Sequence, residues 1–263
     1  MVGKDNEMSS LKYVLAVALI AVTGTLVVCQ DKPKNEVEIR ATVSVPSGEA
    51  NFSGTGAAGS TIDFNRDFDF KNEWGFEIKY AYRSENGKHK FAFDYANTDW
   101  DRTRTITRSF TFRGETYVIG ASVEANLRQS VWRGMYSYRW GNDKIRIGPM
   151  VDMGVIPTRL DLTGTTLSGT GRKTEGSISK FAATVGYDLD YDPTSKVSLF
   201  NNLGVIAFRH DRLFHAEGGI KYFPAHNFGA VAGYKFQRYR WVDDENFFKV
   251  TSHAPFVGGV VRW

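Results

Sequence analysis

Apolar and polar residues alternate with a period of two along most of the chain. In the stretch WGFEIKYAYR, residues 74–83, the even positions are aromatic or aliphatic and the odd positions include Glu77, Lys79 and Arg83. Successive side chains of a β-strand point to opposite faces, so this stretch predicts a strand with one apolar and one charged face. The alternation recurs almost to the C-terminus, and no stretch after residue 35 shows a sustained helical period.

The alternation divides the chain into ten candidate strands. They span residues 36–45, 74–84, 89–98, 124–140, 144–160, 177–191, 196–208, 213–223, 228–241 and 247–263. Short links with turn residues, such as Asn86-Gly87, join some of them, whereas 46–73 and 161–177 form long connections. This alternation of links predicts an all-β, up-and-down antiparallel barrel of about ten strands, or eight if the first and one other candidate do not form.

The charges alone leave open which face points inward, because a soluble barrel also presents charges to water. Two features of the strands favour a transmembrane barrel with its aromatic face toward lipid. Tyrosine and tryptophan lie toward the strand ends of the apolar face, as the two membrane interfaces require. The strands are also long enough for the roughly 9 to 11 tilted residues that cross the hydrocarbon layer. A soluble secreted barrel remains the alternative.

The C-terminus supplies a third feature. It reads PFVGGVVRW, residues 255–263, and its final aromatic residue, Trp263, closes an alternating strand. This ending resembles the C-terminal recognition signal of bacterial outer-membrane barrels, and residues 36–263 resemble small barrels of that class. The resemblance implies a place in the outer membrane of a Gram-negative bacterium, contact with outer-membrane lipid and lipopolysaccharide, and recognition of the last strand by the barrel assembly machinery.

The first segment differs from the rest of the chain. Lys4 and Lys12 precede an unbroken apolar run, residues 13–22, whose length and flanks suit an export signal better than a spanning helix. We therefore divide the chain into a signal peptide (residues 1–29), a linker (residues 30–35) and an outer-membrane β-barrel (residues 36–263).

The single cysteine, Cys29, ends the expected signal peptide. The sequence LVVC before Gln30 resembles a bacterial lipobox, although Val28 stands where Gly, Ala or Ser is usual. Lipidation of Cys29 is therefore an alternative to ordinary cleavage. Because the exported part has no further cysteine, it has no disulfide to form.

The charge balance excludes little. The 263 residues carry 33 Lys and Arg against 29 Asp and Glu, which gives a formal net charge of +4. An exported barrel without a DNA- or RNA-binding motif is not expected to bind nucleic acid.

The charged faces of the strands predict what fills the lumen. They carry ten cations and seven anions: Arg40, Lys79, Arg83, Lys90, Arg133, Arg139, Arg146, Lys180, Lys221 and Lys235, with Glu38, Glu77, Asp94, Asp152, Asp188, Asp190 and Glu217. Open channels are reached nearer 16 to 18 strands, so about ten strands predict a largely occluded lumen. The expected role is structural support of the envelope, or porin-like but restricted passage of small solutes or ions.

The segment TIDFNRDFDF, residues 61–70, places acidic or amide side chains at alternate positions. A calcium loop requires Gly at its sixth place and Glu at its twelfth, where this chain has Phe68 and Trp74. We therefore expect no metal and no cofactor. The alternation with Ile62, Phe64 and Phe68 indicates an amphipathic strand, or a loop folded against the barrel mouth.

The connection after the third strand carries a basic run, DRTRTITRSFTFRGE. Its arginines Arg102, Arg104, Arg108 and Arg113 are candidates for contact with lipopolysaccharide phosphates, since guanidinium groups bind phosphate oxygens well. A solvated hairpin tip is the alternative interpretation.

Two enzymatic alternatives concern the outer rim. Omptin proteases, which are ten-stranded outer-membrane barrels, use two aspartates facing an Asp-His pair, and this chain has Asp99 and Asp101 after the third strand with His210 and Asp211 after the seventh. The adjacent His210 and Asp211 would point to opposite faces of a strand, which departs from that arrangement. A lipid A deacylase would need a His-x-Ser pair, which none of the five histidines has. We therefore expect no enzyme, with an outer-membrane hydrolase as the alternative.

Overall fold

The computed structural model describes residues 33–54, 58–208, 211–243 and 246–263. The expected signal peptide, Cys29, residues 30–32 of the expected linker and His210 lie outside the described residues, so the predictions made for them stay predictions.

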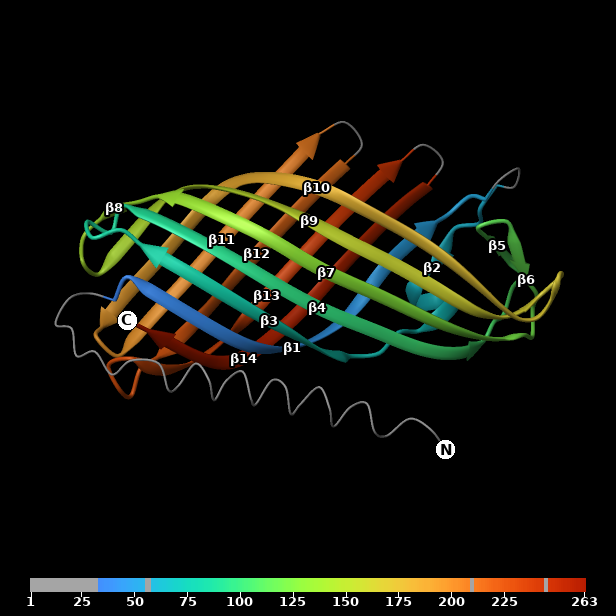
Figure 1. The fold of residues 1–263 in the computed structure, drawn as a ribbon, viewed down its shortest axis with the longest axis horizontal. Coiled ribbons are helices and arrows are strands. Elements are labelled where there is room, and N and C mark those ends of the chain that lie inside the picture. The colour runs from blue at the N-terminus through green and yellow to red at the C-terminus, as the bar shows by residue number, and fades with distance from the viewer. Residues whose placement is uncertain (1–32, 55–57, 209–210, 244–245) are drawn as a thin grey trace.

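Ten long strands form a closed antiparallel barrel (Figure 1). They are β1 (Asn35–Asn51), β3 (Glu73–Arg83), β4 (His89–Thr105), β7 (Ser122–Tyr138), β9 (Ile145–Thr166), β10 (Gly169–Thr194), β11 (Val197–Phe208), β12 (Asp211–Tyr222), β13 (Phe228–Asp243) and β14 (Asn246–Arg262). Each pairs with the next along the chain, and β14 pairs with β1 to close the ring. The prediction of an all-β, up-and-down barrel of ten strands is confirmed.

The connections give the barrel two different ends. The turns at residues 84–88, 139–144, 195–196 and 223–227 lie at one end, which we call the short-turn end, with Trp263 beside Asn35. The other end, which we call the plug end, carries the small elements β2 (Ile62–Asp63), η1 (Phe64–Phe68), β5 (Phe110–Phe112) and β6 (Glu115–Tyr117). The remaining element, β8 (Trp140–Gly141), pairs with β9.

One predicted connection is wrong. Residues 161–177 were expected to form a long loop, but β9 continues to Thr166, β10 begins at Gly169, and the two strands pair along this stretch. Similarly, residues 46–51 of the expected loop 46–73 belong to β1. Backbone hydrogen bonds between neighbouring strands extend these strands although the added residues are rich in Thr and Gly. Figure 1 shows β9 and β10 reaching beyond the ends of β11–β14.

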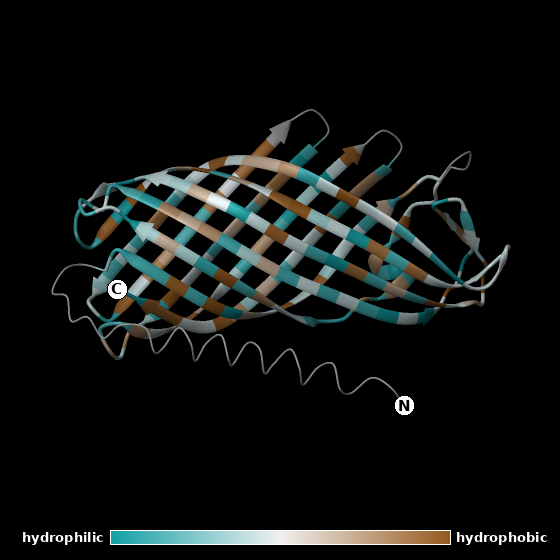
Figure 2. Ribbon diagram, in the orientation of Figure 1, coloured by the Kyte–Doolittle hydropathy of each residue, from teal (hydrophilic) through white to brown (hydrophobic). Residues whose placement is uncertain are grey.

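The two faces of the wall exchange polarity along the strands. In the half near the short-turn end, exposed apolar side chains such as Trp132, Val151 and Phe181 point outward. In the half near the plug end, most of the outward positions are polar or charged, and many inward positions are apolar, including Leu127 and Leu160. Figure 2 shows the alternation of hydrophilic and hydrophobic residues along each strand. The aromatic face of residues 74–83 is therefore the outer face, as the sequence predicts.

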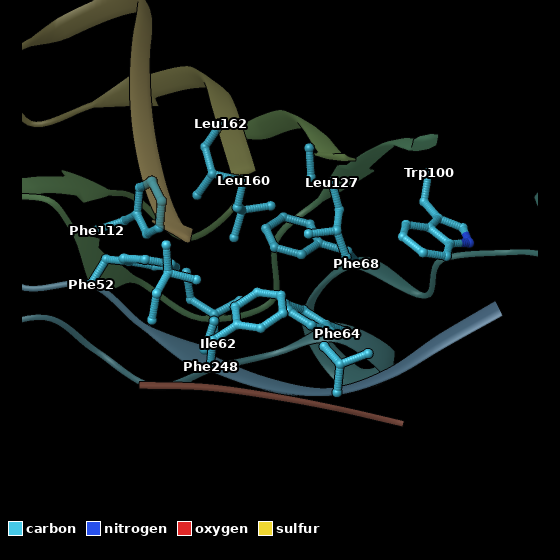
Figure 3. Close-up of a cluster of buried hydrophobic side chains, with 14 of the residues drawn as sticks. Phe52, Ile62, Phe64, Phe68, Trp100, Phe112, Leu127, Leu160, Leu162 and Phe248 are labelled. Carbon is cyan, nitrogen blue, oxygen red and sulfur yellow. The ribbon is translucent and has the colours of Figure 1, made fainter. Parts of the chain in front are cut away.

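A separate apolar core fills the plug end (Figure 3). Residues 52–54 and 58–72 and the β5–β6 hairpin together form what we call the plug. Its side chains pack against inward residues of the wall: Phe52, Ile62, Phe64, Phe68 and Phe112 from the plug meet Trp100, Leu127, Leu160, Leu162 and Phe248. All ten are at most 2% exposed, so of the two interpretations of residues 61–70 the structure shows the segment folded against the mouth.

The acidic residues of this segment have structural partners. Asp63 caps η1, because its carboxylate accepts hydrogen bonds from the backbone N–H groups of Asn65 and Arg66.

Within the described residues, no helix is long and apolar enough to cross a lipid bilayer.

Candidate functional site: a charged lumen and an apolar plug

Inward side chains of the short-turn half form one continuous set of contacts, which we call the lumen network. Its members are the cations Arg40, Lys79, Arg83, Lys90, Arg133, Arg139, Lys221 and Lys235, the anions Glu36, Glu38, Glu77, Asp94, Asp152, Asp188, Asp190 and Glu217, and His215. The eight cations match the eight anions, so with a neutral histidine the network carries no net charge.

Arg40 lies at the centre of this network. Its guanidinium contacts the carboxylates of Glu38 (2.5 Å), Glu77 (3.0 Å) and Glu217 (2.8 Å), and its side chain is 0% exposed. The guanidinium carbon also lies 4.3 Å from the ring centroid of Phe256, which is within cation–π range. One residue of β1 thus joins carboxylates from β1, β3 and β12.

A second cluster surrounds two carboxylates of β10. Lys90 Nζ lies 2.9 Å from Asp188 and 3.2 Å from Asp190, and Arg139 contacts both. Arg83 joins Asp190 to Glu36 on β1. Lys221 bridges Glu36 and Glu38, which connects this cluster to that of Arg40.

His215 occupies a third part of the network. Its Nε2 lies 2.7 Å from Asp152 and 3.3 Å from the hydroxyl of Thr184, and its Nδ1 lies 3.0 Å from a guanidinium nitrogen of Arg133. A Cβ atom on Gly204 would come within 2.2 Å of the same imidazole, so only glycine leaves room for the ring. Arg133 also forms a two-bond pair with Asp94.

The paired arrangement follows from the cost of burying charge. An ion removed from water needs a partner and hydrogen bonds, and a buried pair that loses one member leaves an uncompensated charge. Most of these carboxylates touch more than one cation. Side chains from strands on opposite sides of the barrel meet in the lumen. The cations and carboxylates of the lumen network neutralise one another.

The structure brings together every residue predicted for the lumen except two. Arg146 lies near the short-turn end, 3.7 Å from Asp143, and Lys180 donates a hydrogen bond to the carbonyl of Val242 nearer the plug. Sequence reasoning missed Glu36 and His215. Glu36 shares the face of Glu38 at the first residue of the predicted strand, and His215 lies on the predicted charged face but was not counted as a charge.

Arginines and one aspartate hold the plug in place. The buried carboxylate of Asp67 contacts Arg108 at 2.6 Å and Arg66 at 3.1 Å. Burial alone would raise the pKa of Asp67, but hydrogen bonds from Arg108, Arg66 and the backbone of Asp63 lower the pKa below its ordinary value. We call the pair Asp67–Arg108 the plug latch.

Two of the other arginines proposed to contact lipopolysaccharide also form hydrogen bonds at the plug, Arg104 from the wall and Arg113 from the β5–β6 hairpin of the plug itself. Arg104 donates to the carbonyl of Arg66 at 2.9 Å, and Arg113 donates to the carbonyl of Ser53 at 3.3 Å. Arg102 lies on the same inward face of β4 as Arg104. The contact of Arg102, Arg104, Arg108 and Arg113 with lipopolysaccharide stays a prediction, and what the structure describes is a set of side chains directed at the plug.

The three described residues of the hydrolase alternative, Asp99, Asp101 and Asp211, are not gathered at the mouth, and His210 lies outside the described residues. Asp99 and Asp101 are exposed on the outer face of β4, opposite Arg128 and Asn126 of β7. Asp211 accepts a hydrogen bond from the backbone of Val242. Among the described residues, no group of three or more His, Cys, Asp or Glu is placed to hold a metal ion.

Comparisons with known proteins agree with the fold. No protein-family model and no curated protein sequence matches the chain. The structure is similar to that of the outer membrane protease OmpT from Escherichia coli, with a TM-score of 0.56 and 9% identity over 92% of this chain and 100% of that chain. At this identity the similarity shows the fold alone.

Two further solved structures are similar at lower scores. The translocator domain of autotransporter NalP from Neisseria meningitidis has a TM-score of 0.45 and 14% identity, over 98% of both chains. Ail, the attachment invasion locus protein of Yersinia pestis, has a TM-score of 0.36 and 13% identity, over 88% of this chain and 99% of that chain.

Arg40 provides the first test of the lumen network. Replacing Arg40 by Met removes one cation from three buried carboxylates and is expected to lower the free energy of unfolding by about 3 to 5 kcal/mol. Urea unfolding of the folded barrel in detergent micelles measures the change. The matched control is Arg128→Met on the exposed outer wall, where less than about 1 kcal/mol is expected. Equal effects of the two substitutions would show that the Arg40 contacts contribute little.

The plug latch predicts a dependence on pH. Because the pKa of Asp67 in the folded protein lies below the ordinary value of 3.8, its contribution is present above that pH and is lost as the pH falls through the lowered pKa. Pepsin should therefore cut the plug of the Asp67→Asn variant about tenfold faster than wild type at pH 5, since a charge-assisted bond contributes about 1.5 kcal/mol or more. The ratio of the two rates should fall toward one as the pH falls below 3.8 and through the lowered pKa. A ratio that does not change with pH would contradict the latch.

Proposed function

We propose that this chain is an integral barrel of the bacterial outer membrane whose lumen is closed, with a structural and non-enzymatic role in the envelope. The observation that carries the proposal is the band of exposed large apolar side chains around the short-turn half of the wall, including Phe91, Met153, Val185, Ile220 and Val257. Soluble monomers rarely expose apolar patches of this extent, so a lipid environment suits this surface better than water does.

The dimensions of the band support this environment. On β13 the outward residues from Phe228 to Phe236 are apolar or small, and Arg238 follows them. With a rise of about 3.3 Å per residue and a tilt of about 40°, Arg238 lies roughly 25 Å from Phe228 along the barrel axis, which matches the height of an outer-membrane apolar band. Tyr82, Tyr138 and Trp140 lie outward at the short-turn edge, as interfacial aromatic residues do.

The connections support an orientation. Outer-membrane barrels have short periplasmic turns and longer external loops, so the short-turn end would face the periplasm and the plug end the exterior. The strands of the plug half, with polar outer and apolar inner faces, would then stand above the membrane in water. Recognition of the strand that ends at Trp263 by the barrel assembly machinery is part of the same proposal.

Two barriers in series support a closed lumen. The lumen network fills the level of the apolar band with paired charges, and the plug fills the mouth with packed phenylalanine side chains. A path for ions would have to pass both. This arrangement favours structural support over restricted passage, and the outward position of Asp99 and Asp101 favours it over the omptin-like alternative.

Fractionation and conductance test the proposal together. The chain with its first segment is expressed in a Gram-negative host, and the protein is expected in the outer-membrane fraction as a band that migrates faster before boiling than after it. Purified protein in a planar bilayer should give no steady conductance. The variant lacking residues 58–72 should also stay closed because the lumen network remains, whereas Arg40→Ala combined with Lys79→Ala in that variant should leak.

Release of the protein as a soluble species would contradict the membrane proposal. A steady open channel in the wild type would contradict the closed lumen, and hydrolysis of added peptide or lipid A that is lost in Asp99→Ala would contradict the non-enzymatic role. A gel shift on each variant confirms that it is folded before its conductance is measured.

A further inference from the structure

The outer wall carries a row of basic side chains directly above the apolar band. Arg212 of β12 pairs in register with Arg240 of β13, Arg240 pairs with Lys249 of β14, and Lys249 pairs with Glu49 of β1. Arg238 lies two residues before Arg240 on the same outward face. Four cations from three adjacent strands therefore stand side by side.

This row is electrostatically unfavourable by itself. Like charges that lie directly opposite each other on neighbouring strands destabilise a sheet, and here two such pairs are adjacent. Lys249 has a partner in Glu49, at 2.9 Å. Across the residues that the structure describes, Arg212, Arg238 and Arg240 form no ion pair, so among these residues the row carries more positive than negative charge. An anionic ligand would relieve this repulsion.

The row borders a groove that is also partly apolar. The groove has a volume of about 590 Å³, and its lining includes the four cations together with Val205, Phe214 and Phe247. Below it on the same faces lie the apolar residues of the band, such as Tyr234 and Phe236. A ligand that fits this surface has an anionic head against the cations and an apolar body that continues along the band.

We propose that this surface, which we call the basic groove, binds the phosphate-bearing headgroup of an outer-leaflet glycolipid such as lipopolysaccharide. Guanidinium groups donate paired hydrogen bonds to phosphate oxygens, and the height of Arg238 and Arg240 at the edge of the band places them at headgroup level. The proposal rests on the proposed membrane location. It assigns the lipid contact to residues other than the arginines at the plug, three of which have partners there.

The opposite side of the barrel offers a matched control. Arg128 and Arg159 pair in register on the outer wall of β7 and β9 and line a smaller groove of about 320 Å³. Arg159 lies 2.8 Å from both Asp161 and Glu175, and Asp99 faces Arg128. Acidic neighbours therefore neutralise this second groove, and it is not expected to retain a phosphorylated lipid.

Binding of diphosphoryl lipid A to the folded barrel in detergent micelles, measured by native mass spectrometry, tests the proposal. The variant R212Q/R240Q/K249Q should bind at least about tenfold more weakly than wild type, because it loses charge-assisted hydrogen bonds to the phosphate oxygens. R128Q/R159Q should bind as wild type does. Dephosphorylated lipid A should bind weakly to all three proteins, and inorganic phosphate at equal ionic strength should not compete.

Equal binding by R212Q/R240Q/K249Q and wild type would overturn the basic groove. Competition by inorganic phosphate as strong as that by the lipid would overturn the lipid headgroup as its ligand. The gel shift on boiling separates this test from that of the proposed function. A wild-type protein that inserts and shifts but shows no preference for the phosphorylated lipid refutes the groove alone, whereas one that does not insert refutes the membrane location.

Discussion

The closed antiparallel ladder is the constraint on which the rest of the structure depends. Once β14 pairs with β1, every wall strand has one face to the lumen and one to the surroundings, and a shift of one residue would exchange all of its side chains. The register therefore decides at each height which residues are enclosed. In lipid a closed sheet is also the only sheet that satisfies all of its backbone hydrogen bonds.

Within this constraint the chain places two different interiors in series. Where the outer face is apolar, the interior consists of neutralised charges around Arg40, and where the outer face is polar, the interior consists of the phenylalanine-rich plug. In each half the wall has one apolar and one polar face. The half with the apolar outer face suits lipid, and the half with the polar outer face suits water. Buried ion pairs are weak sources of stability compared with apolar packing, but here they link β1 to β3, β10 and β12 and favour one register over its neighbours.

The sequence predicted the half of the barrel near the short-turn end in detail. There the period of two pairs aromatic residues with charges, so strands, faces and nearly all of the lumen residues follow from the pattern. On β4 the polarity of the faces reverses beyond Thr98, where the predicted strand ends, and on β9 the reversal is complete at Arg159 and Leu160, where that predicted strand ends. The stretch 161–177 reads as a loop because Thr and Gly carry little apolar signal, although backbone pairing with the neighbouring strand makes it part of the wall.

Ligand-related features depended on tertiary structure. The basic groove combines residues from β12, β13 and β14 whose cross-strand register is not visible in any one segment. The direction of Arg104 and Arg108 toward the plug depends on how residues 58–72 fold back. Likewise, His215 gains its partners from β7, β9 and β10. Local pattern identified the charged residues, and the closed topology decided their contacts.

The exchange of polarity along one face of one strand is tested most directly by a pair of nitroxide labels on β10. Val185 and Ser177 both point outward, the first within the apolar band and the second beyond it. In lipid vesicles, the label at residue 185 should collide with oxygen and be protected from a water-soluble nickel chelate, and the label at residue 177 should show the reverse. Access of the nickel chelate to both labels would contradict a lipid-facing band.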